Sequence, residues 1–317
     1  YSVTVTATDA EGAVFVQSFA ITVTDVNETP TAIALSATAI DENAAGAVVG
    51  TLSTSDVDAG DTHTYELSGT DAASFEVVNG ELKLKDSVTA NYETQSSYSV
   101  TVTATDSGSL TATQDFTVNI NNLNDAPTLV NAIADQNVDE DSALSFTVPA
   151  DAFNDEDGDT LTYTATLSDG SALPSWLSFD AATQTFSGTP LNGDVGSISV
   201  EVTATDAAGV TISDTFSITI ANTNDAPTEI ALSSLAIDEN AAGAVVGTLS
   251  TTDVDVGDTH TYTLSGTDAE SFEVVNGELK LVGSADHETK NSYSVTVTAT
   301  DAEGAVFVQS FAITVTD

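Results

Sequence analysis

Carboxylates stand at alternate positions, close to glycine, in three loops of similar sequence. A single Asp-x-Asp is ordinarily an exposed turn. Here the arrangement recurs three times in one chain, and glycine permits the tight turn that lets alternate carboxylates converge on one ion. The pattern therefore predicts cation binding. The three loops are Asp56-Val-Asp58-Ala-Gly-Asp61, Asp155-Glu-Asp157-Gly-Asp159 and Asp253-Val-Asp255-Val-Gly-Asp258.

Further oxygen donors accompany each loop at matching points of the sequence. In the run Tyr98–Asp106, apolar residues alternate with hydroxyl residues, so Asp106 has the parity of the inward-facing positions of a strand. A carboxylate there must reach solvent at the end of the sheet or meet a cation. Asp206 and Asp301 end two equivalent runs. The remaining donors are Glu42, Glu140 and Glu239 in acidic tripeptides, and Asp25, Asn27, Glu28, Asn124, Asp125, Asn224 and Asp225 in three linkers.

Calcium is the ion that suits these donors. All of them are hard oxygen ligands, and the chain has no cysteine, no methionine and no clustered histidine. Ca²⁺ takes roughly six to eight oxygens in a flexible shell, whereas Mg²⁺ demands a more rigid octahedron and retains water. We therefore predict Ca²⁺ as the bound ion. Small modules without disulfides need another source of rigidity, and divalent ions would supply it.

The chain is an array of repeats. Residues 1–25 are identical to residues 293–317, and a linker that ends in proline recurs at 25–30, 122–127 and 222–227. A spacing of about 100 residues is typical of one β-sandwich with its own core. Self-similarity of this kind indicates a repeat architecture. We predict the last strands of a preceding module, followed by three complete modules; the bounds are 1–25, 26–122, 123–221 and 222–317.

Strands of period two dominate the sequence, and no helical period of useful length is present. The dipeptide Asn79-Gly80 predicts a hairpin over Phe75–Leu84, with a copy over Phe272–Leu281. Short strands with turn signals at regular spacing predict an all-β fold, with seven-stranded sandwiches joined end to end. The middle module has Leu173–Phe179 in place of the hairpin, and we interpret its tryptophan, Trp176, as a core residue rather than a platform for sugars.

The charge limits the partners of the chain. Forty-nine acidic residues face four lysines and no arginine, for a formal net charge of −45. Nucleic acids and anionic membrane surfaces attract basic residues, so we expect neither partner. No apolar run approaches the roughly 18 residues of a membrane helix, and we expect no membrane insertion in this segment. The regular alternation of apolar residues argues against disorder.

The loops, linkers and strand ends together resemble the bacterial cadherin-like repeats of very large extracellular adhesins. The Ala-x-Asp of that family is matched at Ala104-Thr-Asp106, Ala204-Thr-Asp206 and Ala299-Thr-Asp301. Its Asp-Arg-Glu is matched at Asn91-Tyr92-Glu93 and Asp286-His287-Glu288. The resemblance implies Greek-key sandwiches with calcium at each junction between modules, and it adds Glu93, Asp286 and Glu288 to the ligands.

The resemblance also assigns ligands to particular junctions. The middle module resembles the dystroglycan-type variant and has no Asp-Arg-Glu match, so we expect the junction that follows it to lose calcium first. Asp194 is a candidate substitute for the missing motif. The expected ligands at the junction before the middle module are Glu42, Glu93, Asn124, Asp125, Asp155, Asp157 and Asp206, and those at the junction after it are Glu140, Asn224, Asp225, Asp253, Asp255 and Asp301.

Two functions stay open on the sequence alone. One is a calcium-stiffened extracellular spacer of a bacterial surface adhesin or fibre, whose partners are the neighbouring modules and, as an open alternative, like chains. The other is a carbohydrate-binding or cell–cell adhesive module with a polysaccharide partner. His63, His260 and His287 offer no nucleophile–base pair, so we expect no enzyme, and we interpret His63 and His260 as ordinary strand residues. Residues 1–25 contain only two strands and need a further segment or a neighbouring chain to cover them.

Overall fold

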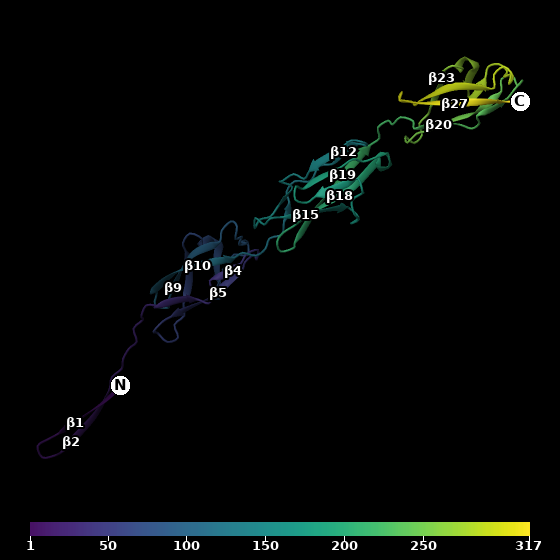
Figure 1. The fold of residues 1–317 in the computed structure, drawn as a ribbon. Coiled ribbons are helices and arrows are strands. Elements are labelled where there is room, and N and C mark those ends of the chain that lie inside the picture. Colours follow the sequence, from purple (N-terminus) through teal and green to yellow (C-terminus); the bar gives the residue numbers. More distant parts are fainter. The chain divides into compact units, whose positions relative to one another are not determined.

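The computed structural model describes residues 1–317, which form two compact units, Tyr1–Asp125 and Ala126–Asp317. Strands make up the regular structure of both units (Figure 1). The helical segments are three 3₁₀ turns of three residues each, and none is a candidate membrane span. The turns are η1 (Ala72–Ser74), η2 (Asn192–Asp194) and η3 (Ala269–Ser271).

An antiparallel hairpin stands first in the chain. Its strands are β1 (Ser2–Thr8) and β2 (Val14–Ala20), which form a two-stranded sheet of their own. Every residue of both strands is exposed, including alternating apolar residues such as Val3 and Val5. The alternation of apolar and polar residues that is typical of a half-buried strand is therefore present in this hairpin, but its apolar side chains are exposed.

Two four-stranded sheets form the first sandwich. Their strand orders are β4-β10-β9-β6 and β3-β5-β8-β7. The pair β4–β10 is parallel, and the other pairs are antiparallel. The strands are β3 (Ala32–Leu35), β4 (Ala39–Asp41), β5 (Val48–Ser55), β6 (Thr64–Ser68), β7 (Phe75–Val78), β8 (Glu81–Leu84), β9 (Ser97–Thr105) and β10 (Thr111–Asn121).

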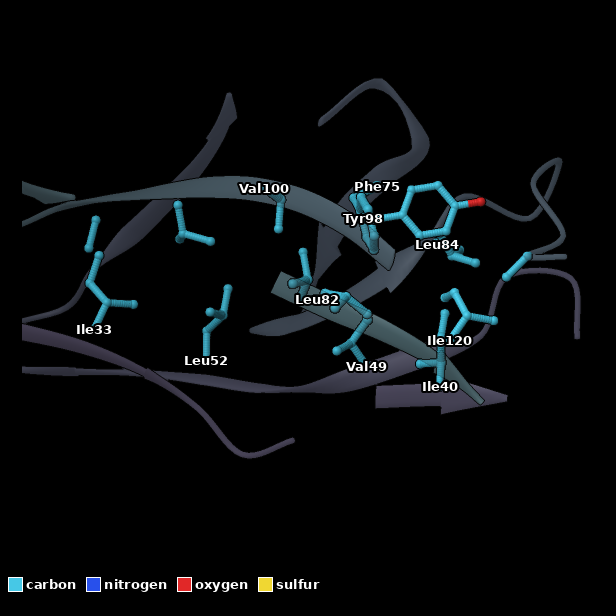
Figure 2. Close-up of a cluster of buried hydrophobic side chains, with 14 residues drawn as sticks. Ile33, Ile40, Val49, Leu52, Phe75, Leu82, Leu84, Tyr98, Val100 and Ile120 are labelled. Atoms are coloured by element: carbon cyan, nitrogen blue, oxygen red, sulfur yellow. The ribbon is translucent and has the colours of Figure 1, made fainter. Parts of the chain in front are cut away.

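The core of this sandwich lies between its two sheets, where side chains such as Leu82 and Val100 face each other (Figure 2). Along β9, Val100, Val102 and Ala104 are fully buried, and the hydroxyl residues between them are more exposed. The alternation predicted from sequence is confirmed. Burying one Val or Leu side chain contributes about 1.5–3 kcal/mol, so these positions stabilise the pairing register as well as the core.

The middle sandwich has a different set of sheets. They are the four-stranded sheet β12-β19-β18-β15, the three-stranded sheet β13-β17-β16 and the pair β11-β14. Aromatic rings fill its core: Phe186 is fully buried and lies 4.6 Å from Phe179 and 5.6 Å from Phe216, centroid to centroid. The strands are β11 (Thr128–Leu129), β12 (Gln136–Asp139), β13 (Leu144–Thr147), β14 (Phe153–Asn154), β15 (Thr162–Leu167), β16 (Leu177–Asp180), β17 (Thr185–Gly188), β18 (Gly196–Thr205) and β19 (Thr211–Ala221).

The third sandwich repeats the sheet orders of the first, with β21-β27-β26-β23 facing β20-β22-β25-β24. Its Asn-Gly hairpin has the expected turn, with φ of 52° at Asn276 and 77° at Gly277, and Asn79 and Gly80 are similar at 51° and 81°. Both hairpins are confirmed. The strands are β20 (Glu229–Leu232), β21 (Ala236–Asp238), β22 (Val245–Thr252), β23 (Thr261–Ser265), β24 (Phe272–Val275), β25 (Glu278–Leu281), β26 (Ser292–Thr300) and β27 (Val306–Thr316).

The first strand of each outer sandwich is divided between the two sheets. In the first sandwich β3 pairs with β5, whereas β4 pairs with β10, so the seven expected strands are present as eight segments. The chain crosses between the sheets directly over Gly50. A Cβ atom there would lie 2.7 Å from Ser36 Oγ and 2.9 Å from Ala37 N, so the crossing requires glycine at this position.

Trp176 is partly buried and packs against the core of the middle sandwich, as predicted. The backbone next to it makes a close contact with β17. A Cβ atom added to Gly188 would lie 1.8 Å from the carbonyl oxygen of Trp176. Only glycine allows strands β16 and β17 to meet at this point.

The substitution Gly188→Ala should therefore destabilise the middle sandwich by at least about 1–3 kcal/mol, because the backbone must move to admit the methyl group. Trp176 is the one tryptophan of the chain, so denaturant unfolding followed by its fluorescence reports this sandwich alone. Gly193→Ala is the matched control, since no atom lies within 4 Å of its added Cβ, and it should stay within about 0.5 kcal/mol of the parent. Equal stabilities for the two variants would contradict the contact.

Candidate metal centres

In each sandwich, an aspartate follows the long penultimate strand and is buried. Its place in the alternation of inward-facing residues predicted this. Asp106 follows β9 and is 6% exposed. Its Oδ1 accepts the backbone N–H of Leu110 at 2.8 Å, and its Oδ2 accepts an Nδ2–H of Asn27 at 3.0 Å. The linker residue Asn27 is thereby held at the end of the strand. The equivalents Asp206 and Asp301 are each 5% exposed.

The linker before the first sandwich also contacts the acidic loop. The backbone N–H of Glu28 donates to Asp58 Oδ2 at 2.8 Å, and Asp25, Glu28 and Asp58 each offer a carboxylate oxygen within 4.8 Å of the others. The pKa of Glu28 is raised, chiefly by a hydrogen bond with Asp58, then by burial and by the charges of Asp58, Asp25 and Asp56. A proton or a cation is therefore favoured between these groups.

The linker between the middle and third sandwiches makes two equivalent contacts and one further contact. Asn222 Nδ2 donates to Asp255 Oδ1 at 2.8 Å, and the backbone N–H of Asp225 donates to Asp255 Oδ2 at 2.7 Å. Asn224 Nδ2 donates to Asp301 Oδ2 at 3.0 Å, as Asn27 does to Asp106. Amide donors of the linker thus position the carboxylates of the loop and of the strand end.

Glu140 completes a carboxylate cluster at this linker. The side chain is 1% exposed, its Oε1 accepts the backbone N–H of Thr223 at 2.8 Å, and its buried Oε2 has no hydrogen-bond donor. Glu140, Asp225 and Asp255 offer oxygens within 4.8 Å of one another. The pKa of Asp225 is raised by burial and then by the charges of Asp141, Glu140, Asp255 and Asp253. This arrangement of converging, poorly neutralised oxygens can bind a hard cation.

Glu42 has the second hydrogen-bond partner that Glu140 lacks. Glu42 is also 1% exposed, but its Oε1 accepts the N–H of Leu123 at 2.7 Å and its Oε2 accepts the N–H of Tyr92 at 2.6 Å. The middle sandwich has no match to the motif at residues 91–93, and although Pro190 accepts the N–H of Asp141 as Ala90 accepts that of Asn43, no N–H of the segment that follows reaches Glu140 Oε2. In the first unit, Glu42, Glu93 and Asp125 also bring carboxylate oxygens within 4.8 Å.

The acidic loop of the middle sandwich contains a second buried carboxylate oxygen that accepts no hydrogen bond. Asp155 is 8% exposed; its Oδ1 accepts the N–H of Asp159 at 3.3 Å, and its buried Oδ2 has no donor. Asp157 is partly buried in the same loop. Asp206 follows β18, and its Oδ1 accepts the N–H of Val210 at 2.7 Å.

The other predicted residues have varied surroundings. Glu239 Oε2 accepts the N–H of His287 at 3.0 Å, and Asn124 Nδ2 donates to the carbonyl of Asp125 at 3.0 Å. Asp286 is exposed and accepts the N–H of Thr289 at 3.0 Å, while Glu288 is exposed with an oxygen 3.9 Å from Nδ1 of His287. Asp194, the candidate substitute, accepts the N–H of Leu191 at 2.9 Å in its own turn.

The structure adds two carboxylates that were not among the predicted ligands. Asp61 groups with Asp56 and Asp106, and Asp258 groups with Asp253 and His260, again within 4.8 Å. The Oδ2 atoms of Asp61 and Asp258 are buried without a donor. In the sequence, each of them is the third acidic residue of its loop and directly follows a glycine, and this position could have identified them.

The interpretation of two histidines as strand residues is wrong. His63 and His260 lie one residue before β6 and β23, with side chains about 10% exposed. His63 Nε2 lies 3.2 Å from Asp56 Oδ2, and His260 Nε2 lies 2.9 Å from Asp253 Oδ2. The loop turns back on itself, so a residue seven positions later reaches its first carboxylate.

Two regions of the chain match known domain families. Residues 36–121 match the family model of the cadherin domain, and residues 126–221 match the one described as "Putative Ig domain". The structure of mouse cadherin-23 EC22–24 is similar over 92% of this chain and 100% of its own, at 20% identity and a TM-score of 0.68. Cadherin domains 1–4 of protocadherin gamma B7 match over 96% and 80%, at 21% identity and a TM-score of 0.60. The chain is an all-β protein of tandem cadherin-like sandwiches.

Part of the chain is similar to a bacterial surface adhesin. The "Serine-rich adhesin for platelets" of Staphylococcus aureus strain USA300 is 37% identical over 118 residues. That match covers 37% of this chain and 5% of the adhesin, so the chain spans a small part of this relative. The domain families and this relative together support an extracellular adhesive or structural role.

Asp225→Asn should stabilise the chain when divalent ions are removed by a chelator. Because the folded-state pKa of Asp225 is raised, its contribution to stability is present below the ordinary aspartate pKa of about 3.9 and is lost as pH rises through the folded value. The neutral amide avoids that loss, and we expect a rise of about 1–2 °C in the melting temperature at pH 7. Glu229→Gln removes one exposed charge outside these clusters and is the control. A lower melting temperature for Asp225→Asn in chelator would contradict the argument.

Proposed function

We propose that this chain is a calcium-stiffened spacer of a large bacterial surface adhesin or fibre, built from modules at residues 26–122, 123–221 and 222–317. The cadherin-like fold and the similarity to a staphylococcal adhesin support an extracellular structural role. The observation that carries the calcium assignment is the Glu140 carboxylate. It is almost fully buried, one of its oxygens has no donor, and two further carboxylates lie beside it.

A divalent cation resolves two costs of this cluster at once. A buried acceptor without a donor loses the hydrogen bonds it would have with water. Carboxylates a few ångströms apart also repel each other, and burial strengthens that repulsion. A calcium ion would coordinate the donorless oxygen of Glu140 and neutralise the charges of Asp225 and Asp255. Oxygen donors of this kind, without sulfur, suit calcium better than transition metals.

Other donor groups in each unit would hold further ions. The donors of the first unit are Asp25, Asn27, Glu28, Asp56, Asp58, Asp61 and Asp106 around one linker, and Glu42, Glu93, Asn124 and Asp125 around the other. The donors of the second unit are Asp155, Asp157 and Asp206 in the middle sandwich, Glu140, Asn224, Asp225, Asp253, Asp255, Asp258 and Asp301 around residues 222–225, and Glu239, Asp286 and Glu288 in the third sandwich.

Calcium would stiffen the second unit through its linker. Glu140 belongs to the middle sandwich, Asp255 and Asp301 belong to the third, and residues 222–225 hydrogen-bond to both. An ion between Glu140, Asp225 and Asp255 would connect all three segments. The backbone of a linker is otherwise free to rotate, and ordering it costs about 1–2 kcal/mol per residue. The ion would offset that cost.

An adhesive module that binds carbohydrate is the second candidate. The similarity to the staphylococcal relative is the observation that favours it, since that protein is named as an adhesin for platelets. Trp176, the side chain best suited to stack on a sugar, packs against the core instead. We therefore favour the spacer. We propose no catalytic role, in keeping with the adhesion-type domains that the chain matches.

Calcium titration tests the proposal. With dissociation constants of about 10⁻⁴–10⁻³ M, typical of extracellular calcium modules, about 10 mM calcium should stabilise each site by about 1.4–2.7 kcal/mol relative to chelator. Calorimetry should show Glu140→Gln weakening binding at least about tenfold, the loss typical of a perturbed metal shell, with Glu229→Gln unchanged. A chain that binds no calcium at about 10 mM is not calcium-stiffened. Calcium-dependent retention on polysaccharide would instead favour the adhesive module.

A further inference from the structure

A histidine contacts the first carboxylate of the acidic loop in two of the three sandwiches. In the third sandwich, Nε2 of His260 lies 2.9 Å from Oδ2 of Asp253. In the first sandwich, Nε2 of His63 lies 3.2 Å from Oδ2 of Asp56. Both pairs are buried, because the histidine side chains are 10% exposed and the aspartate side chains are 5% and 4% exposed. An ionised carboxylate can only accept a hydrogen bond, so the imidazole donates its Nε2–H.

The other oxygen of each carboxylate is held from within the loop. The N–H of Asp255 donates to Asp253 Oδ1 at 3.2 Å. The N–H of Asp58 donates to Asp56 Oδ1 at 3.1 Å. The pKa of Asp56 is lowered, first by the hydrogen bond from Asp58 and, against the effect of burial, by the hydrogen bond from His63. A carboxylate has about four lone-pair sites, so two donors orient it and leave sites for a cation.

The middle sandwich has leucine in place of this histidine. Leu161 stands two residues before Tyr163, just as each histidine stands two residues before a tyrosine. The three tyrosines have the same pairing partner, the alanine of the Ala-x-Asp motif: Tyr65 pairs with Ala104, Tyr163 with Ala204, and Tyr262 with Ala299. Leu161 packs against the core, and Oδ2 of Asp155, the first carboxylate of this shorter loop, is buried without a donor. The sandwich without the histidine is thus the one whose first loop carboxylate lacks a donor.

The carboxylate that His260 contacts belongs to the charge cluster at the linker. Asp253, Asp258 and His260 offer ligand atoms within 4.8 Å of one another. The charge of Asp253 also contributes to the raised pKa of Asp225, after burial and three other carboxylates. The orientation of the Asp253 carboxylate therefore affects the place where negative charge is concentrated.

We propose that His63 and His260 are positioning residues for calcium, each acting through the first carboxylate of its loop. This role depends on the calcium binding proposed above and adds to it residues outside the set of ligands. A neutral imidazole suits the role, because it orients the carboxylate and leaves its charge available to the ion, whereas a cationic partner would offset that charge. Hydrogen-bond partners of metal ligands typically account for about 10–100-fold of metal affinity.

Two substitutions at one position separate the hydrogen bond from the bulk of the ring. His260→Leu removes the donor and introduces the residue that the middle sandwich has at position 161. His260→Gln keeps a neutral N–H donor on a side chain of similar reach and is the conservative variant. His63 is unchanged in both variants, so the first unit, which contains it, is the internal control.

The two loops can be followed separately in the full-length chain. Gly257 and Gly60 lie in the two loops, and labelling with ¹⁵N-glycine gives a spectrum of only 20 backbone amide signals. Calcium titration at about pH 9, above the ordinary histidine pKa of about 6.5, compares neutral side chains. Spectra recorded in chelator show whether each variant keeps the fold of the parent.

His260→Leu should weaken the calcium affinity reported by Gly257 at least about tenfold, whereas His260→Gln should stay within about threefold of the parent. Gly60 should report the same affinity in the parent and in both variants. The reciprocal variant His63→Leu should weaken the affinity at Gly60 and leave Gly257 unchanged. Rescue by glutamine identifies the donor as the cause, since a role in packing alone would not be restored by an amide.

Three results would overturn the role of the histidines. One is an affinity at Gly257 that is equal or higher in His260→Leu while the parent binds calcium, which would leave the proposed function intact. Another is an equal loss with leucine and glutamine, which would indicate packing or direct ligation by the ring. The third is a parent chain in which neither glycine signal responds to calcium, which would contradict the proposed function as well.

Discussion

Negative charge without cationic side chains to neutralise it is the constraint on which this structure depends. The lysine ion pairs lie at Glu76, Asp86, Asp268 and Glu278, none of which is a predicted ligand. The buried carboxylates at the sandwich ends are held by backbone N–H groups and asparagine amides instead. These dipoles fix the positions of the oxygens, but they do not cancel the charge. Neutralisation must come from protons or from cations in solution.

The order of the linkers follows from this constraint. Several contacts between a linker and a sandwich end are hydrogen bonds to a carboxylate, as with Glu28 on Asp58 and Asp225 on Asp255. Such a bond is strongest when the carboxylate is ionised, yet the ionised carboxylates repel one another. The linker and the charge balance of the cluster are therefore coupled. A divalent ion would favour the ionised state and the ordered linker together.

The sandwiches themselves are stabilised by ordinary burial, and their strands are locally determined. Residues 1–25 and 293–317 adopt the same hairpin with the same register in different surroundings. The core contacts are made only where the opposite sheet and both edge strands are present. A two-stranded sheet exposes one apolar face and two open edges, so its conformation is specified by sequence while its stability depends on a partner.

The sequence by itself determined every feature that depends on local period and turn chemistry. Alternation placed Val100, Val102 and Ala104 inward, Asn-Gly dipeptides made the two hairpins, and parity placed Asp106 at a buried strand end. Tertiary structure alone decided the rest, because contacts between residues 50 to 81 positions apart leave no periodic signal in the sequence. Examples are the donors that reach Glu42 from Tyr92 and Leu123, and the division of the first strand between two sheets. The oxygen of Glu140 that accepts no hydrogen bond belongs with them, because only the packed structure shows that the segment after Pro190 directs no N–H to it.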